Sequence, residues 1–302
     1  MSEVRAGRRS IEISHPDKLL FPADGITKLD LAEHYARVAP AMLPHVRDRP
    51  VTMHVFPGGI AERGVYIKKA PSHFPEWVER VTVDKQGGTV DMAIANDAAA
   101  LVYLANQNCI TAHVWPARID DLQHPDRLIF DFDPPDGTDF DDVRAAARAT
   151  GDLLRDVGLE PFAMTSGSRG LHVVAPIRRD AGWEVARRFA RAAGERLADA
   201  HPDTLTVEHR IAKRGGRIYV DTTRNAYGQH AVAPYAVRAK PGAPVATPLH
   251  WDELNDPELR SNRWTIRTIG DRLESEGDPW KGIGRNARSL AKVADRLGAA
   301  VS

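Results

Sequence analysis

In residues 126–140, DRLIFDFDPPDGTDF, an apolar run ends on two acids and two prolines. Run 127–132 predicts a strand, and Pro134 and Pro135 end it. Asp131 and Asp133 are two positions apart, so their carboxylates share one face of that strand. Carboxylates this close repel each other unless a cation neutralises them, and Mg²⁺ or Mn²⁺ with substrate phosphates is the ordinary occupant. A turn with helix-capping acids is the alternative that this motif alone leaves open, whereas an EF-hand fits poorly because Pro135 takes its third ligand position.

The elements that follow this strand predict an α+β core. A helix begins after it with Thr138 as the cap and Asp141 at the third position, and Gly158 lies just past its end. Two strands near 160–165 and 171–177, a helix over 183–200 and strands near 204–208 and 217–221 come next. This β-α-β-β-α-β order is ferredoxin-like, and in that fold the first and third strands form an antiparallel central pair. We therefore expect Asp131 and Asp133 to face His172 and the loop at 165–170.

The N-terminal part predicts a second, α/β lobe. We expect residues 1–10 to be loose, and 27–48 to form a helix that Thr27 caps with Asp30 three residues on. Strand-like segments follow at 51–56 and 65–68, and a mostly buried helix at 97–108. Turn residues at 116–126 predict the boundary, which gives lobes 1–118 and 119–302 within one compact domain.

Composition narrows the class of protein. The 302 residues are 42% hydrophobic and 27% charged, with 41 basic and 41 acidic side chains, so zero net charge neither favours nor excludes nucleic acid. Cys109 is the single cysteine, which excludes an internal disulfide and a CxxC zinc site. The sequence has no uncharged apolar run of about 20 residues and no secretory signal at its start, so we expect a cytoplasmic protein.

Further residues predict a site for phosphates and metal ions. Asp221 ends the strand at 217–221, and three carboxylates at strand ends suit a two-metal phosphoryl-transfer site, although a turn residue is the simpler reading of Asp221 alone. The loop TSGSRG at 165–170 offers hydroxyls, backbone amides and a guanidinium to phosphates, or is only a turn. His172 is either a phosphate ligand at this site or a buried, hydrogen-bonded histidine.

Basic side chains gather near these acids and in the N-terminal lobe. They are either solvated charges or contacts to a polyphosphate or nucleic acid. Around and after Asp221 they are Arg210, Lys213, Arg214, Arg217, Arg224 and Arg238. Lys18, Lys28, Lys68 and Lys69 predict a second basic track, with Tyr66, Phe56 and His113 available to stack on bases.

The ordered motifs DFDP, SGSRGLH, YVD and APYAVR closely resemble the polymerase domain of bacterial ligase D, which belongs to the archaeo-eukaryotic primase superfamily. The resemblance extends from HPDKLLFPADGITK at 15–28 to HWDELNDPELR at 250–260. It implies an RRM-like (ferredoxin-like) catalytic core with a packed N-terminal α/β lobe. It also implies a polymerase that fills ends during non-homologous end joining.

Position by position, the resemblance implies roles for individual residues. Asp131, Asp133 and Asp221 are implied as catalytic ligands of two Mg²⁺ or Mn²⁺ ions. The implied nucleotide-binding residues are Ser166, Ser168, Arg169, His172, His113, Arg214 and Arg238. The implied or predicted DNA-binding residues are Lys18 and Lys28 at a 5′-phosphate, with Lys68, Tyr66 and Arg224.

Some positions depart from the family pattern. His15 stands where asparagine is familiar in the family, and residues 53–57, which include His54, stand in place of a more basic stretch. Val65–Tyr66 replaces two phenylalanines, and Arg224 replaces an uncharged polar residue. The catalytic set is intact while the DNA-positioning set has changed, so we expect altered preference for ends or templates. No K-x-D-G motif of a nucleotidyl-lysine ligase occurs, so the resemblance implies a stand-alone form that works with Ku and a separate ATP-dependent DNA ligase on gapped or broken DNA.

Three hypotheses follow. The first is a template-dependent polymerase of the primase-polymerase type that adds NTPs or dNTPs to primer 3′ ends in DNA break repair. The second is a phosphatase like the haloacid dehalogenases, which also carry a strand ending in D-x-D but usually continue with Gly-Thr. The third is a non-catalytic module that binds DNA ends.

Overall fold

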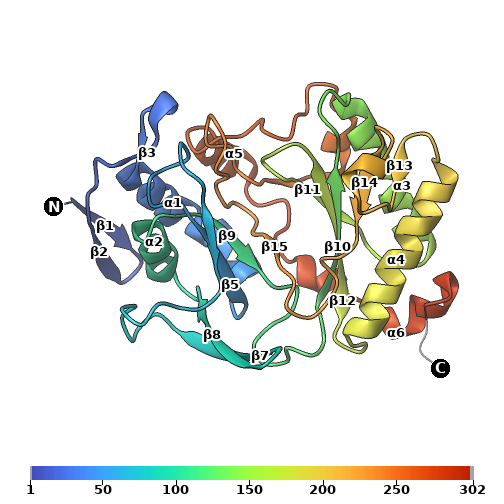
Figure 1. The fold of residues 1–302 in the computed structure, drawn as a ribbon, viewed down its shortest axis with the longest axis horizontal. Coiled ribbons are helices and arrows are strands. Elements are labelled where there is room, and N and C mark those ends of the chain that lie inside the picture. The colour runs from blue at the N-terminus through green and yellow to red at the C-terminus, as the bar shows by residue number, and fades with distance from the viewer. Residues whose placement is uncertain (1, 300–302) are drawn as a thin grey trace. The chain divides into compact units, whose positions relative to one another are not determined.

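The computed structural model describes residues 2–299, which form two compact units. The first comprises the chain up to Trp115 together with His230–Thr247 and Asn262–Asp278; the second comprises Pro116–Gln229, Pro248–Ser261 and the chain from Pro279 (Figure 1). The break after Trp115 lies close to the predicted boundary. The predicted lobes differ in one respect, since they put 230–247 and 262–278 in the C-terminal lobe. These segments belong to the first unit, where Ala231 and Val232 pair with Val114 and His113.

The first unit is built on a six-stranded sheet in the order β15-β9-β5-β8-β7, with β6 paired to β5. The strands are β5 (Pro50–Val55), β6 (Val65–Ile67), β7 (Arg80–Lys85), β8 (Gly88–Ile94), β9 (Cys109–Val114) and β15 (Ala231–Val232). Three helices belong to this unit: α1 (Lys28–Val46), α2 (Ala98–Asn106) and α5 (Ile269–Glu276). Helices α1 and α2 pack against each other, and β3 (Leu19–Phe21) pairs with β4 (Ile26–Thr27) just before α1.

The predicted start of α1 is confirmed. The Thr27 side chain accepts a hydrogen bond from the Asp30 N–H at 3.2 Å, and the Asp30 carboxylate accepts one from the Thr27 N–H at 2.7 Å. This reciprocal capping box satisfies two backbone donors that no helical carbonyl can reach. The helix therefore begins where the local sequence requires.

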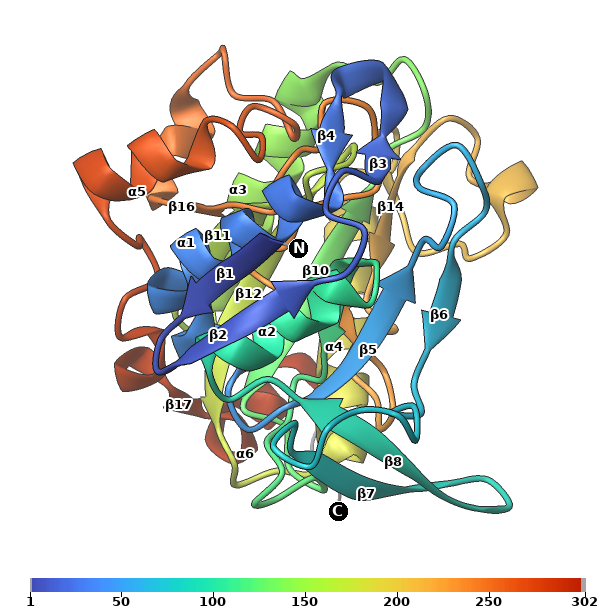
Figure 2. The ribbon, with the colours of Figure 1, turned by 90° about the vertical axis from the view of Figure 1, so that its left-hand side faces the viewer.

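The prediction of a loose N-terminus is wrong for residues 2–10, and residue 1 lies outside the described residues. Strand β1 (Ser2–Ala6) pairs antiparallel with β2 (Arg9–Ile13). Val4, Ala6, Ile11 and Ile13 alternate with polar residues and are buried. Figure 2 shows this hairpin beside α1 and α2, which it contacts. Burial of its apolar face outweighs the polar, basic composition that suggested a loose segment.

The second unit confirms the predicted strand order. Its sheet runs β13-β14-β10-β12-β11-β16, with β17 paired to β12. The strands are β10 (Arg127–Asp133), β11 (Phe162–Thr165), β12 (Leu171–Arg178), β13 (Leu205–Thr206), β14 (Ile218–Asp221), β16 (Pro248–Leu249) and β17 (Arg288–Ser289). Strands β10 and β12 are the antiparallel central pair. Helices α3 (Phe140–Asp156) and α4 (Trp183–Ala200) contact this sheet and lie on one side of it in Figure 1, and α6 (Leu290–Val293) contacts α4.

The predicted cap of α3 is wrong by one residue. Asp139 is the cap, and its carboxylate accepts a hydrogen bond from the Asp141 N–H at 3.0 Å. Thr138 is engaged elsewhere, because its hydroxyl donates to the carbonyl of Pro135 at 2.9 Å in the preceding turn. Gly158 follows the helix with a φ of 88°, as expected of a glycine just past a helix end. No helix within residues 2–299 is both long and apolar enough to cross a membrane.

Candidate active site

Strand β10 carries two acids on the face opposite its most apolar side chains. Leu128, Phe130 and Phe132 are completely buried, each stabilising the fold by roughly 2–3 kcal/mol, and they alternate with Ile129, Asp131 and Asp133. Asp131 lies directly opposite His172 of β12 and opposite Asp221 of β14. Directly opposed residues of neighbouring strands share one face of the sheet. Asp131, Asp133, Asp221 and His172 are therefore brought to one face.

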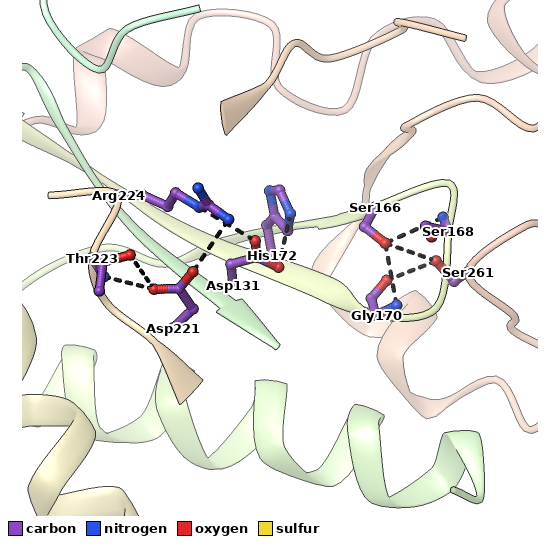
Figure 3. A network of polar contacts seen from close by, with 9 residues as sticks. All are labelled: Asp131, Ser166, Ser168, Gly170, His172, Asp221, Thr223, Arg224 and Ser261. Carbon is purple, nitrogen blue, oxygen red and sulfur yellow. Dashed lines mark hydrogen bonds and ion pairs between the residues drawn. The ribbon is translucent and has the colours of Figure 1, made fainter. Parts of the chain in front are cut away.

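Hydrogen bonds and ion pairs hold this cluster (Figure 3). His172 Nε2 is 3.1 Å from Asp131 Oδ1. Asp221 Oδ1 accepts hydrogen bonds from the backbone N–H and the hydroxyl of Thr223, at 2.8 and 2.5 Å. The Arg224 guanidinium lies 3.2 Å from Asp221 Oδ2 and 3.7 Å from Asp131 Oδ2. Arg224, predicted to contact DNA, is thus placed on the acids, and its DNA contact stays a prediction.

Crowding of the carboxylates affects Asp133 most clearly. Burial, followed by the charges of Asp131 and Asp221, raises the pKa of Asp133, and Arg224 and Arg214 oppose the rise without cancelling it. Burial and then Asp221 raise the pKa of Tyr219, which lies opposite Asp133 on β14, to about 12. The Arg214 guanidinium lies 4.0 Å from the centre of the Tyr219 ring, so this predicted residue is next to the acidic face.

The donor set suits a hard divalent cation, because Mg²⁺ and Mn²⁺ bind carboxylate oxygens, and because burial and then the charges of Asp131 and Asp221 raise the pKa of Asp133. Among residues 2–299, however, no three His, Cys, Asp or Glu side chains are gathered closely enough to hold a metal ion as they stand. Arg224 accounts for part of this difference, since it occupies the Oδ2 atoms of two of the acids. The residues therefore fit the metal chemically, but they are not arranged as a ready metal site.

The predicted phosphate loop is closed internally. The Ser166 hydroxyl accepts hydrogen bonds from the N–H groups of Ser168 and Gly170, both at 3.2 Å, and contacts the Ser261 hydroxyl at 3.2 Å. Ser261 in turn donates to the carbonyl of Gly170 at 2.7 Å (Figure 3). Arg169 is exposed and pairs with Asp136. Ser168 and Arg169 are thus more accessible than the buried Ser166, and binding of phosphates by the loop stays a prediction.

Gly170, the residue before strand β12, has no room for a side chain. A Cβ atom added to Gly170 would lie 1.8 Å from the carbonyl oxygen of Phe132. The close approach sets the loop against the end of β10, immediately before Asp133. Gly170 therefore fixes the distance between the loop and the acid-bearing strand.

Several predicted residues form an aromatic cluster within the first unit. Tyr66, 53% exposed, stacks on His54 with 4.0 Å between ring centres and 9° between ring planes. His113 meets Tyr66 edge-on at 5.5 Å and His230 at 5.2 Å. Burial, followed by the charge of Arg238, lowers the pKa of His54 to about 4, so this imidazole is neutral at physiological pH. An exposed ring on a neutral stack suits contact with a nucleobase.

The predicted lysines of the first unit differ in environment. Lys28 is buried, and its Nζ donates to the carbonyl and hydroxyl of Ser14 at 2.8 and 2.9 Å. Burial and then the charge of Lys18 lower the pKa of Lys28 to about 8. Lys18 Nζ donates to the carbonyl of Pro57, and Lys68 is exposed after β6.

Sequence reasoning missed residues that shape the acidic face and the loop at 165–170. Thr223 and Asn225 follow Asp221 in a turn, and Asn225 is fully buried and bonded to the N–H and carbonyl of Ile129. Ser261 closes the loop from 91 residues away. The position of Thr223 two residues after an aspartate is a recognisable turn signal. Nothing local marks Ser261.

Comparisons with known proteins agree with this arrangement. Residues 27–280 match the family described as LigD, primase-polymerase domain. The polymerase domain of Mycobacterium tuberculosis ligase D, solved in complex with DNA, superposes with a TM-score of 0.87 at 32% identity, covering 92% of this chain and 99% of that one.

Curated relatives extend the similarity to several bacteria. The multifunctional non-homologous end joining protein LigD of Mycolicibacterium smegmatis is 33% identical over 95% of this chain and 37% of its own length. That of Pseudomonas aeruginosa is 33% identical over 97% of this chain and 35% of its own length, and the bifunctional protein of Bacillus subtilis is 28% identical over 91% and 44%. The chain therefore spans less than half the length of these relatives.

Fold, acidic face and comparisons together define a mixed α/β protein of the primase-polymerase class. The chain belongs to the LigD primase-polymerase domain family.

Proposed function

We propose that this chain is a template-dependent nucleotidyltransferase that adds NTPs or dNTPs to primer 3′ ends, filling gaps in DNA breaks during non-homologous end joining. Family membership supports the class of reaction. The observation that carries the proposal is the register that sets Asp131 opposite both His172 and Asp221. The strand order β14-β10-β12-β11, with α3 and α4 on one side, supports an RRM-like catalytic core.

Asp131, Asp133 and Asp221 would hold two Mg²⁺ or Mn²⁺ ions, which would lower the pKa of the primer hydroxyl and neutralise charge on the reacting phosphate. His172 orients Asp131, and Thr223 orients Asp221. Ser168 and Arg169 of the loop would bind the triphosphate, with Arg214 beside the acids. The primer 3′ oxygen then bonds to the α-phosphorus as the bond to pyrophosphate breaks, and the hydroxyl proton passes to solvent.

The first unit would supply contacts to DNA and to the nucleotide. Lys18 and Lys28 suit a 5′-phosphate because their ammonium groups, on Pro57 and Ser14 respectively, are close enough for the charge of Lys18 to act on Lys28. Tyr66 and Lys68 suit a template strand, and His113 and Arg238 suit the nucleotide or the templating base. The proposed partners are gapped or broken DNA with a 5′-phosphate, Ku and a separate ATP-dependent DNA ligase, in the bacterial cytoplasm.

The test is primer extension on a gapped duplex with Mg²⁺ or Mn²⁺. Asp131→Ala and Asp133→Ala should abolish extension while DNA binding persists, and Asp152→Ala, which removes an exposed carboxylate of α3, should extend normally. Normal extension by either active-site variant would overturn the metal assignment. DNA binding by the unaltered protein without extension would favour an end-binding module. Phosphate release from a small phosphoester without nucleotide incorporation would favour a phosphatase.

A further inference from the structure

Arg224 occupies the acidic face in the manner of a bound cation. Its Nη2 atom is 3.2 Å from Asp221 Oδ2 and its Nε atom is 3.7 Å from Asp131 Oδ2 (Figure 3). The two carboxylates are 7% and 13% exposed, whereas the Arg224 side chain is 32% exposed. Two largely buried acids from different strands are thus bridged by a guanidinium that solvent can reach.

The remaining oxygens of the two bridged acids also have protein partners. Asp131 Oδ1 lies 3.1 Å from His172 Nε2, and Asp221 Oδ1 accepts the two hydrogen bonds from Thr223. The Oδ2 atoms that Arg224 contacts are therefore the ones on which an incoming cation would compete with a charged group. A divalent ion bound to these Oδ2 atoms would lie within a few ångströms of the guanidinium and would be repelled by it. The ion and Arg224 therefore cannot contact the Oδ2 atoms of Asp131 and Asp221 together.

The backbone keeps Arg224 beside the acids whatever its side chain does. Asn225, the next residue, accepts a hydrogen bond from the Ile129 N–H at 2.8 Å and donates one to the Ile129 carbonyl at 2.7 Å. Ile129 precedes Asp131 by two residues on β10, so this pair of bonds ties the turn after β14 to the acid-bearing strand. Because Asn225 is fully buried, the anchor is rigid, while the longer Arg224 side chain can turn towards solvent.

We propose that Arg224 is an internal counter-ion of the acidic site: it neutralises Asp131 and Asp221 when no divalent ion is bound, and ion binding requires the guanidinium to leave them. The inference rests on the proposed metal role of the three aspartates. It explains why a basic side chain lies between two of the three carboxylates and why these are not gathered as a ready metal site. It predicts that Arg224 weakens the binding of divalent ions to the free protein.

The test measures Mn²⁺ affinity of the full chain without nucleotide, from the electron paramagnetic resonance signal of free Mn²⁺. Arg224→Gln should bind Mn²⁺ at least fivefold more tightly than the unaltered protein. Arg196→Gln removes the same charge from an exposed position on α4 and should stay within twofold. In EDTA, Arg224→Gln should also unfold at a lower temperature, because two buried carboxylates lose their counter-ion, and Mn²⁺ should reverse that loss.

The outcomes separate this inference from the proposed function. Unchanged or weaker Mn²⁺ affinity in Arg224→Gln, with circular dichroism showing a folded protein, would overturn the counter-ion role. Asp131→Asn reports on the metal site itself. If Asp131→Asn and the unaltered protein bind Mn²⁺ equally, the proposed metal assignment fails; if Asp131→Asn alone loses binding, that assignment stands whatever Arg224→Gln does.

Discussion

Neutralising Asp133 should stabilise the metal-free protein while abolishing its proposed activity. Burial, followed by repulsion from Asp131 and Asp221, raises the pKa of Asp133 despite the opposing charges of Arg224 and Arg214. Asp133→Asn retains the size of the side chain and removes the charge. A raised pKa means that the folded protein disfavours the ionised form of the Asp133 carboxyl group. The substitution therefore removes an unfavourable charge from the folded state at neutral pH.

The magnitude follows from strand geometry. Residues two apart on one strand are separated by about 7 Å, at which two carboxylates repel by roughly 2 kcal/mol at an effective dielectric constant of about 20. Solvent and the two arginines reduce the net gain to about 1 kcal/mol, which corresponds to a rise of about 2 °C in Tm for a chain of this size.

The assay is thermal unfolding followed by circular dichroism, first in EDTA and then with Mn²⁺. Asp133→Asn should melt higher than the unaltered protein in EDTA and gain less from added Mn²⁺. Asp84→Asn, which removes an exposed carboxylate from β7, should change the free energy of unfolding by less than about 0.5 kcal/mol. A lower Tm for Asp133→Asn in EDTA, or an equal rise for Asp84→Asn, would refute the crowding argument.

Three further predictions concern protonation and packing. Burial lowers the pKa of His34 and of His54 to about 4, so the unfolded chain takes up protons before the folded protein does as the pH falls. Urea unfolding at pH 7, 5 and 4 should show the free energy of unfolding falling between pH 6.5 and 4, with His34 contributing about 3 kcal/mol of the loss. A flat profile would contradict this. Because the pKa of Lys28 is about 8, the preference of the protein for 5′-phosphorylated over 5′-hydroxyl DNA in a binding assay should decline from pH 7 to 9. Lys28→Arg should retain this preference at pH 9. Loss of the preference in both proteins would exclude Lys28 as the cause. Gly170→Ala, whose Cβ would meet the Phe132 carbonyl at 1.8 Å, should lower the free energy of unfolding by about 3 kcal/mol or more, whereas Gly284→Ala has open space and should be neutral; equal effects would discount the close approach.

Local patterns predicted part of the fold well. The start of α1 follows from its capping residues, and α4 and the βαββαβ order follow from apolar periodicity; both signals act over a few residues. The hairpin of β7 and β8 escaped sequence reasoning although Val81 and Val83 alternate with polar residues before a turn at Gln86–Gly87, and Gly88 opens β8. Both glycines have positive φ, the signal that was available. Strand β9 also escaped, because its side chains are buried on both faces and show no alternation.

Local patterns were enough to predict that three acids, a Gly/Ser loop and His172 lie at strand ends, because strand ends and turns are encoded by neighbouring residues. Which charges meet depends instead on tertiary packing. Arg224 bridges Asp131 and Asp221, Ser261 closes the loop on Gly170, and His230–Thr247 joins the first unit. Contacts to Asp131 and Gly170 join residues about 90 positions apart along the chain. Such contacts depend on how whole elements pack, and no local pattern specifies them.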